Sequence, residues 1–169
     1  GDFEVDLYKD FYVSKQLLST LKTTNKILNV AASIYADENG LNTCILLNDS
    51  KNVVETVYGN LFMLQGNTLT TPPVSEGCIN GVMRKQVLEL AKKIENLEVI
   101  EAVISPFDLQ KADELFFLFL GSKKRLNTTT KNEIINIIDN RFKFDFDKNI
   151  IDLPSLFQYL YAEQDKLKV

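Results

Sequence analysis

The sequence predicts an α+β fold, a strand-rich mixed sheet with flanking helices. Short apolar runs separated by tight turns fill residues 43–71, a pattern typical of a partly antiparallel sheet. Helical periodicity lies on both sides of that region, without the regular strand–helix alternation of a doubly wound fold. With 169 residues, 45% of them hydrophobic, the chain is long enough for one domain with a sizeable core.

The first predicted helix covers residues 24–38. Its apolar residues follow the spacing i, i+3, i+4, i+7 and i+8, which predicts that they form one buried face. Asn39-Gly40 is a suitable stop for the helix. The residues of the predicted buried face are Ile27, Val30, Ala31, Ile34 and Tyr35.

Four short extended segments follow, separated by turn residues. Residues 48–52 form a polar turn cluster, Gly66-Asn67 closes a strand, and Pro72-Pro73 ends the last one. The predicted strands cover residues 43–47, 53–54, 61–65 and 69–71.

The next part of the chain alternates between helix and strand. An amphipathic helix is predicted over residues 82–94, directly after Gly81. Residues 97–103 are predicted to be a strand, residues 107–112 a short helix, and residues 115–120 a buried strand.

Beyond Gly121 the apolar pattern weakens. Residues 122–149 are rich in Lys, Asn, Thr and Asp, and short helices are predicted at residues 133–138 and 153–162. We therefore expect two regions, a folded unit at residues 1–120 and a divergent, partly helical tail at residues 121–169.

Composition excludes several classes of site. The chain has no histidine, so it holds no Ser-His-Asp triad, no Cys-His pair and no histidine metal ligand, and we expect no metal site. The net charge of −4 is spread along the chain, which argues against nucleic-acid binding. No apolar run is long enough to cross a membrane, and the first residues carry no signal-peptide pattern. Cys44 and Cys78 lie in apolar segments and are expected to be buried, reduced thiols of a cytoplasmic protein.

Three features could carry chemistry, and each also has a plain structural interpretation. Gly81-Val82-Met83 begins a helix, where unpaired N–H groups can bind an anion, although most such glycines bind nothing. Lys22 could become a nucleophile if its pKa were lowered, or it could be an ordinary solvated lysine. Glu55 ends an apolar segment and could face solvent or pair with a buried cation.

Four segments in order match short motifs: the lysine segment Leu18–Lys26, the "E…N-[LV]-F" motif at Glu55–Phe62, the "TP…L-x-G-[IV]-[TM]-R" motif at Thr71–Arg84, and the "ADE-[LVI]-F" motif at Ala112–Phe116. Together they resemble class IV aminotransferases, the fold-type IV enzymes that depend on pyridoxal 5′-phosphate (PLP). The resemblance covers about residues 3–117.

The resemblance implies a role for each matching residue. Lys22 would be the catalytic residue that carries the cofactor and moves protons on the substrate. Glu55 would pair with the pyridine nitrogen, and the N–H groups of Val82 and Met83 would hold the phosphate. Gly81 and Asn60 complete the implied cofactor-binding set, and Asn60 is expected to act mainly as a structural residue, as is Arg84.

The resemblance also implies a fold and an activity. The expected fold is that of the large C-terminal domain of fold-type IV enzymes. The function most like this sequence is aminodeoxychorismate lyase, which forms 4-aminobenzoate and pyruvate from 4-amino-4-deoxychorismate. Lys22 and Asn25 match its K-x-x-N pattern, and Met83 stands where aminotransferases usually have Thr. A branched-chain or D-amino-acid aminotransferase is the alternative.

Two departures from the family pattern bear on activity. We expect the family's small N-terminal domain to be missing from this chain, and the match to fail after Phe116, where only Ser122 could replace a phosphate contact. The chain alone is therefore expected to be weakly active or inactive, and a non-catalytic remnant that keeps the fold is a further alternative. The implied partners are a small amino-acid-like substrate and a second copy in a homodimer, without nucleic acid or membrane.

Overall fold

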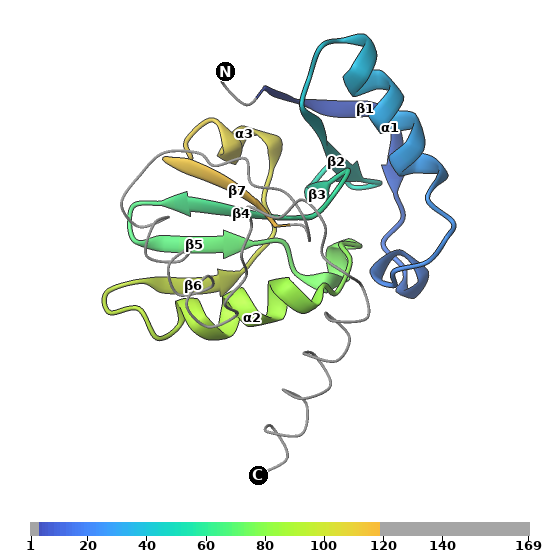
Figure 1. The fold of residues 1–169 in the computed structure, drawn as a ribbon. Coiled ribbons are helices and arrows are strands. Elements are labelled where there is room, and N and C mark those ends of the chain that lie inside the picture. Colours follow the sequence, from blue (N-terminus) through green and yellow to red (C-terminus); the bar gives the residue numbers. More distant parts are fainter. Residues whose placement is uncertain (1–3, 119–169) are drawn as a thin grey trace, which may run out of the picture.

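A computed structural model describes residues 4–118, which form one strongly curled mixed sheet with helices packed on it (Figure 1). The predicted tail at 121–169, its two helices and Ser122 lie outside the described residues. The strands are β1 (Val5–Val13), β2 (Thr43–Asn48), β3 (Val53–Thr56), β4 (Asn60–Gln65), β5 (Thr68–Thr71), β6 (Glu98–Glu101) and β7 (Glu114–Leu118). The helices are α1 (Ile27–Glu38), α2 (Val82–Ala91) and α3 (Pro106–Leu109), with short 3-10 turns η1 (Leu17–Thr20) and η2 (Val74–Glu76).

The strand order β1-β2-β3-β4-β5-β6, with β7 added beside β4, makes the sheet mixed. The outer pairs β1–β2 and β5–β6 are parallel, and the pairs between them are antiparallel. β3 pairs with β4 through Glu55 and Asn60, so two of the predicted site residues are cross-strand partners. The predicted α+β class is confirmed.

The central strands β2, β3 and β4 are buried on both faces, which explains their continuous apolar runs. In β2, Cys44 and Leu46 pack under α1, while Ile45 and Leu47 point to the opposite face. In β4, Phe62 packs under α2, and Leu61 and Met63 pack on the other face.

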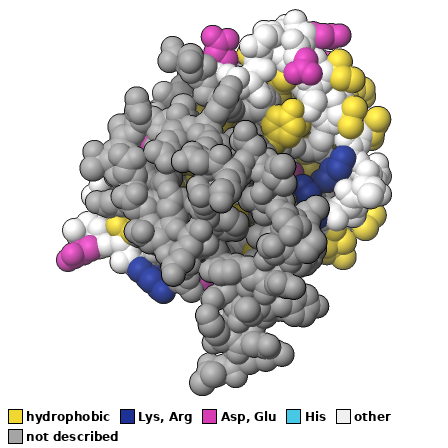
Figure 2. All heavy atoms as spheres, viewed as in Figure 1, with side chains coloured by type: hydrophobic (Ala, Val, Ile, Leu, Met, Phe, Trp, Pro, Cys, Tyr) yellow, Lys and Arg dark blue, Asp and Glu magenta, His cyan; other side chains and the backbone are white. Residues whose placement is uncertain are grey.

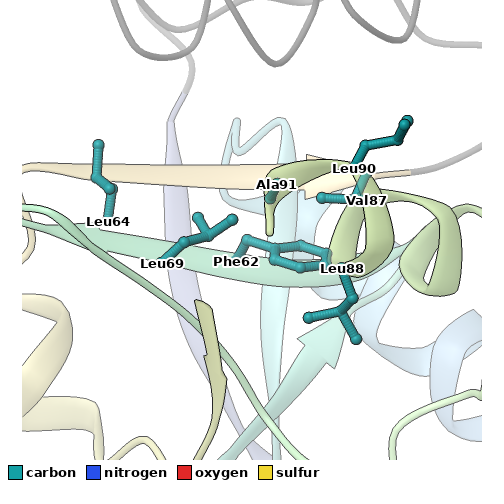
Figure 3. Close-up of a cluster of buried hydrophobic side chains, with 7 residues drawn as sticks. All are labelled: Phe62, Leu64, Leu69, Val87, Leu88, Leu90 and Ala91. Atoms are coloured by element: carbon teal, nitrogen blue, oxygen red, sulfur yellow. The ribbon is translucent and has the colours of Figure 1, made fainter. Parts of the chain in front are cut away.

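The cluster under α2 joins that helix to β4 and β5 (Figure 3). The ring of Phe62 extends toward Val87, Leu88 and Ala91 of the helix. Burying such side chains contributes roughly 1.5–3 kcal/mol each, so this contact fixes where α2 begins relative to the sheet. The buried members of the cluster are Phe62, Leu64, Leu69, Val87, Leu88, Leu90 and Ala91.

The helix predicted at residues 24–38 is confirmed as α1, but its predicted buried face is wrong in part. Ile27 is 74% exposed, and Val30 and Ile34 are more than half exposed. The residues buried against β1 and β2 are Ala32 and Ala36, with Leu28, Ala31 and Tyr35 packed beside them. The helix carries apolar side chains on both sides, and the small alanines allow the closer approach to the sheet, so periodicity alone could not select the face.

Other boundaries also differ from the prediction. β1 was not predicted, although Val, Leu, Tyr and Phe make its sequence rich in strand formers. The helix predicted to reach residue 94 ends at Ala91, and the strand predicted over residues 97–103 is the exposed edge strand β6, of four residues. The short helix predicted at residues 107–112 is α3, which begins at Pro106 behind a Ser105–Asp108 capping box.

Candidate active site

Glu55 is a buried carboxylate in β3, just before the turn that leads into β4. Its Oε2 accepts the backbone N–H of Ile79 at 3.0 Å and the side-chain N–H of Asn60 at 3.4 Å. Burial raises the pKa of Glu55 to about 6, against the opposing effects of the Ile79 N–H and the positive charges of Lys26 and Lys22. The site therefore contains an acid whose charged form lacks the solvation that it would have in water.

The tight turn at residues 57–59 places Asn60 opposite Glu55. Thr56 fixes this turn, because its Oγ1 accepts the Gly59 N–H at 3.1 Å and its backbone N–H donates to the Gly59 carbonyl at 2.8 Å. Asn60 Nδ2 donates to the carbonyl of Ile79 at 2.8 Å. Asn60 thus links the carboxylate of Glu55 to the loop that enters α2.

Gly81 is the N-cap of α2, where backbone and side chain approach closely. Its backbone has φ −67°, so the conformation itself does not require glycine. The requirement is steric, because a Cβ at this position would overlap Oδ1 of Asn60. The N–H groups of Val82 and Met83 follow in the first turn of the helix, where N–H groups have no partner four residues earlier.

Lys22 is exposed and lies directly after η1. Its segment is joined to the same loop, because Asn80 donates its backbone N–H to the Thr20 carbonyl at 3.0 Å. Lys22 is close enough to Glu55 for its charge to lower the pKa of that carboxyl.

The structure therefore brings the predicted residues together around one loop. Backbone groups of residues 79–81 contact Glu55, Asn60 and the segment that carries Lys22. The cofactor-binding roles of these residues and of Val82 and Met83 stay predictions.

Lys26 is a residue of this region that the sequence analysis did not assign. It is half-buried, and its pKa is lowered by burial and by the charge of Lys22, against the attraction of Glu55. No local signal identified it, because Lys26 is the N-cap of α1 and Lys22 lies outside the helix, so no helical spacing pairs the two lysines.

Arg84 has the structural surroundings that the sequence analysis expected. Its guanidinium is buried, donates to the Pro72 carbonyl at 2.8 Å, and forms an ion pair with Glu101 of β6. Arg84 therefore holds the first turn of α2 to the segment that leaves β5.

Two other classes of feature are absent from residues 4–118. These residues contain no group of three or more His, Cys, Asp or Glu side chains that could hold a metal. None of the helices in this range has the length and apolar character needed to cross a membrane. Cys44 and Cys78 are both buried, free thiols, and burial raises the pKa of Cys78 to about 11.

Similarity to known proteins covers the whole described region. A family model described as "Amino-transferase class IV" matches residues 4–118. A protein of Methanocaldococcus jannaschii assigned as a branched-chain-amino-acid aminotransferase is 31% identical over 148 residues, 88% of this chain and 46% of that protein. Aminodeoxychorismate lyase of Vibrio harveyi is 33% identical over 100 residues, 59% of this chain and 36% of the lyase.

A solved structure has the same fold. The branched-chain amino acid aminotransferase of Thermobaculum terrenum, in its PLP form, superposes with a TM-score of 0.73 at 22% identity, covering 86% of this chain and 53% of that chain. This chain thus spans about a third to a half of the length of these proteins. The match over residues 4–118, which carries all four motifs, shows that the chain belongs to the class IV aminotransferase family.

Proposed function

We propose that this chain binds PLP through Lys22 and acts with it on the amino group of a small amino-acid-like substrate. Class IV aminotransferases are PLP-dependent enzymes. The observation that carries the proposal is the loop at residues 79–81, whose backbone contacts both Glu55 and the segment of Lys22.

The surroundings of Glu55 fit a pyridine nitrogen that carries a proton. A buried carboxylate is costly to ionise, and a cation placed against it removes part of that cost. Glu55 would hold this proton at the ring nitrogen, and Asn60 and the Ile79 N–H would orient the carboxylate.

The start of α2 fits a phosphate. The N–H groups of Val82 and Met83 lie at the positive end of a ten-residue helix, and Gly81 lets Asn60 pack directly against the start of that helix. These residues would bind the phosphate through backbone donors.

The cofactor supplies an electron sink that stabilises a carbanion at the substrate Cα. The part left to the protein is to place a base beside that carbon. Lys22 Nζ would take the proton from Cα and return it elsewhere on the substrate.

Two reactions are compatible with this arrangement. The sequence motifs favour aminodeoxychorismate lyase, because of Lys22, Asn25 and Met83. The relative that matches the greater part of the chain is assigned as a branched-chain aminotransferase, which supports amino-group transfer. The lyase would release pyruvate without a second substrate, whereas a transferase would need a 2-oxo acid to accept the amino group.

The test of cofactor binding is a titration of the full chain with PLP, followed by absorbance. We expect a band that is lost in Lys22→Ala and kept in Lys85→Ala, which removes an exposed lysine of α2. Borohydride reduction and peptide mapping should then locate the cofactor on Lys22. A wild-type chain without a Lys22-dependent band would refute the proposal.

Assays for pyruvate release and for amino transfer to a 2-oxo acid distinguish the two reactions. We propose that turnover by this chain alone is weak or absent and that the chain forms a homodimer in the cytoplasm. Robust turnover would eliminate the alternative of a non-catalytic remnant.

A further inference from the structure

A second buried carboxylate, Glu76, lies in η2 between β5 and α2. Its side chain is 6% exposed, and both of its oxygens are bonded. Oε1 forms an ion pair with Lys15 at 2.9 Å, and Oε2 accepts the side-chain N–H groups of Asn48 at 2.7 Å and Asn52 at 3.0 Å. Glu76 thereby joins three segments, the end of β1, the turn between β2 and β3, and the loop before α2.

The charged form of Glu76 is the stable one in this cluster. Burial alone would raise the pKa of the carboxyl, but the bonds from Asn52, Lys15 and Asn48 outweigh burial and lower it. The Asn48 amide is itself held, because its Oδ1 accepts the backbone N–H groups of Ser50 and Asn52 at 3.0 Å each. The anchor of Glu76 is therefore a preorganised set of donors.

The residue after Glu76 fixes the path of the loop. Gly77 has φ +100°, and a Cβ there would lie 3.0 Å from the Ser14 carbonyl oxygen and 3.1 Å from the side chain of Val13. Only glycine combines this backbone conformation with so close an approach to the end of β1.

The anchored loop leads directly to the candidate active site. Three residues after Glu76, Ile79 donates its N–H to Glu55, and the next residue, Asn80, donates its N–H to the Thr20 carbonyl. The segment that leads to Lys22 is thus held at two points, by Lys15 on Glu76 and by Thr20 on Asn80.

We infer that Glu76 is a positioning residue, which through the loop at residues 77–81 sets the position of the Lys22 segment relative to the Glu55 carboxylate. It touches neither group itself. Its effect on the cofactor rests on the proposed function, but its effect on Glu55 does not.

Two variants and one matched control test the inference. Glu76→Gln can still accept a bond from an asparagine, but it presents an N–H to Lys15 and breaks the ion pair. Lys15→Gln breaks the same pair at a side chain that is one-third exposed, and serves if Glu76→Gln does not fold. The control, Asp113→Asn, alters another structural carboxylate, which accepts the Gly66 N–H at 2.7 Å in a different turn.

The first readout is the titration of Glu55 in the cofactor-free full chain, followed by carboxyl NMR. The groups that act on Glu55 are the Ile79 N–H, the Asn60 amide and the charges of Lys26 and Lys22. Loosening the loop weakens the Ile79 bond, so the pKa of Glu55 should rise further above its value of about 6 in the Glu76 or Lys15 variant. It should not change in Asp113→Asn.

The second readout is PLP binding. The Glu76 or Lys15 variant should bind PLP about tenfold more weakly, with a shifted pH midpoint of the Lys22-dependent band, as expected when a supporting group is lost. Asp113→Asn should match the wild type even if it is equally destabilised. An unchanged Glu55 titration in the variants overturns the inference whether or not PLP binds, whereas a wild type without the band refutes only the proposed function.

Discussion

A carboxylate buried as deeply as that of Glu55 opposes folding at neutral pH. The pKa of Glu55 is raised from 4.5 to about 6 by burial, so the folded chain binds this proton more tightly than the unfolded chain does. The stability that this group contributes is complete below pH 4.5 and is lost as the pH rises through about 6. A residue that lowers stability in this way is typical of a functional site.

Glu55→Gln should therefore stabilise the cofactor-free chain at high pH. Glutamine can accept the bonds from Ile79 and Asn60 without a charge, so the stability difference from the wild type should be greater at pH 8 than at pH 4.5 by about 2 kcal/mol. Urea unfolding at the two pH values measures it.

Glu76→Gln is the internal control, because the pKa of Glu76 is lowered. Its charge contributes stability above the ordinary pKa of a glutamate, and this stability is lost as the pH falls through the lower folded value. This variant should cost more stability at pH 8 than at low pH. If the two glutamate variants respond to pH with the same sign, the account of Glu55 is wrong.

Gly81 should not tolerate a side chain, because Asn60 occupies the space. We expect Gly81→Ala to lower the free energy of unfolding by about 1–3 kcal/mol, since the Asn60 amide must leave its bonds to make room. Gly66→Ala is the comparison. It has open space and a φ of +55°, so it should cost about 1 kcal/mol from backbone strain.

A double-mutant cycle identifies the clash. The double variant Gly81→Ala with Asn60→Ala should lose less free energy of unfolding than the sum of the losses in the two single variants. The reason is that Asn60→Ala removes the side chain that the new Cβ would overlap. Additive losses would show that the destabilisation by Gly81→Ala does not come from overlap with Asn60.

At the scale of elements, α2 is held by its buried face and by Arg84. Arg84→Ala should lower the free energy of unfolding by about 3 kcal/mol, because it leaves a cavity and removes the donor to the Pro72 carbonyl. Glu101 is 46% exposed, so Glu101→Gln should cost about 1 kcal/mol or less. Lys85→Ala, at the next and exposed position of the helix, should be nearly neutral.

Chemical denaturation of the three variants measures their losses in the free energy of unfolding and so ranks them. A loss in Glu101→Gln as large as that in Arg84→Ala would show that the ion pair itself, rather than the buried guanidinium, holds the helix.

The elements also show what the sequence could and could not predict. The strands β2, β4 and β5 and the helix α2 were predicted because apolar runs and turn residues are local signals. The strand β1 was missed and the buried face of α1 was misassigned, because both depend on which distant segment packs against them. In the site, the resemblance to the class IV aminotransferase motifs indicated Lys22, Glu55 and Gly81, whereas each residue alone favoured a plain structural interpretation. The bonds made by the backbone of residues 79–80 join segments about 24 and 60 positions apart and have no local signature.

At the scale of the molecule, the part formed by β1, η1 and α1 exposes many apolar side chains. Figure 2 shows hydrophobic side chains gathered over the part of the molecule formed by β1 and α1, with basic side chains among them. An exposed apolar surface of this kind marks an interaction site. The exposed apolar residues of β1, η1, the residue after η1 and α1 include Phe11, Leu17, Leu18, Leu21, Ile27, Val30 and Ile34, each more than two-fifths exposed.

If a second copy covers this surface, as the proposed homodimer requires, charges placed in it should separate the copies. Leu18 and Ile27 are 66% and 74% exposed, so Leu18→Glu with Ile27→Glu should leave folding intact and weaken association at least about tenfold, because each buried carboxylate would be desolvated. Sedimentation equilibrium over a range of concentrations measures the dimer constant. Phe107→Glu, at an equally exposed residue of α3, should leave it unchanged. A wild type that stays monomeric at all concentrations, or equal weakening by Phe107→Glu, would show that this surface does not join two copies.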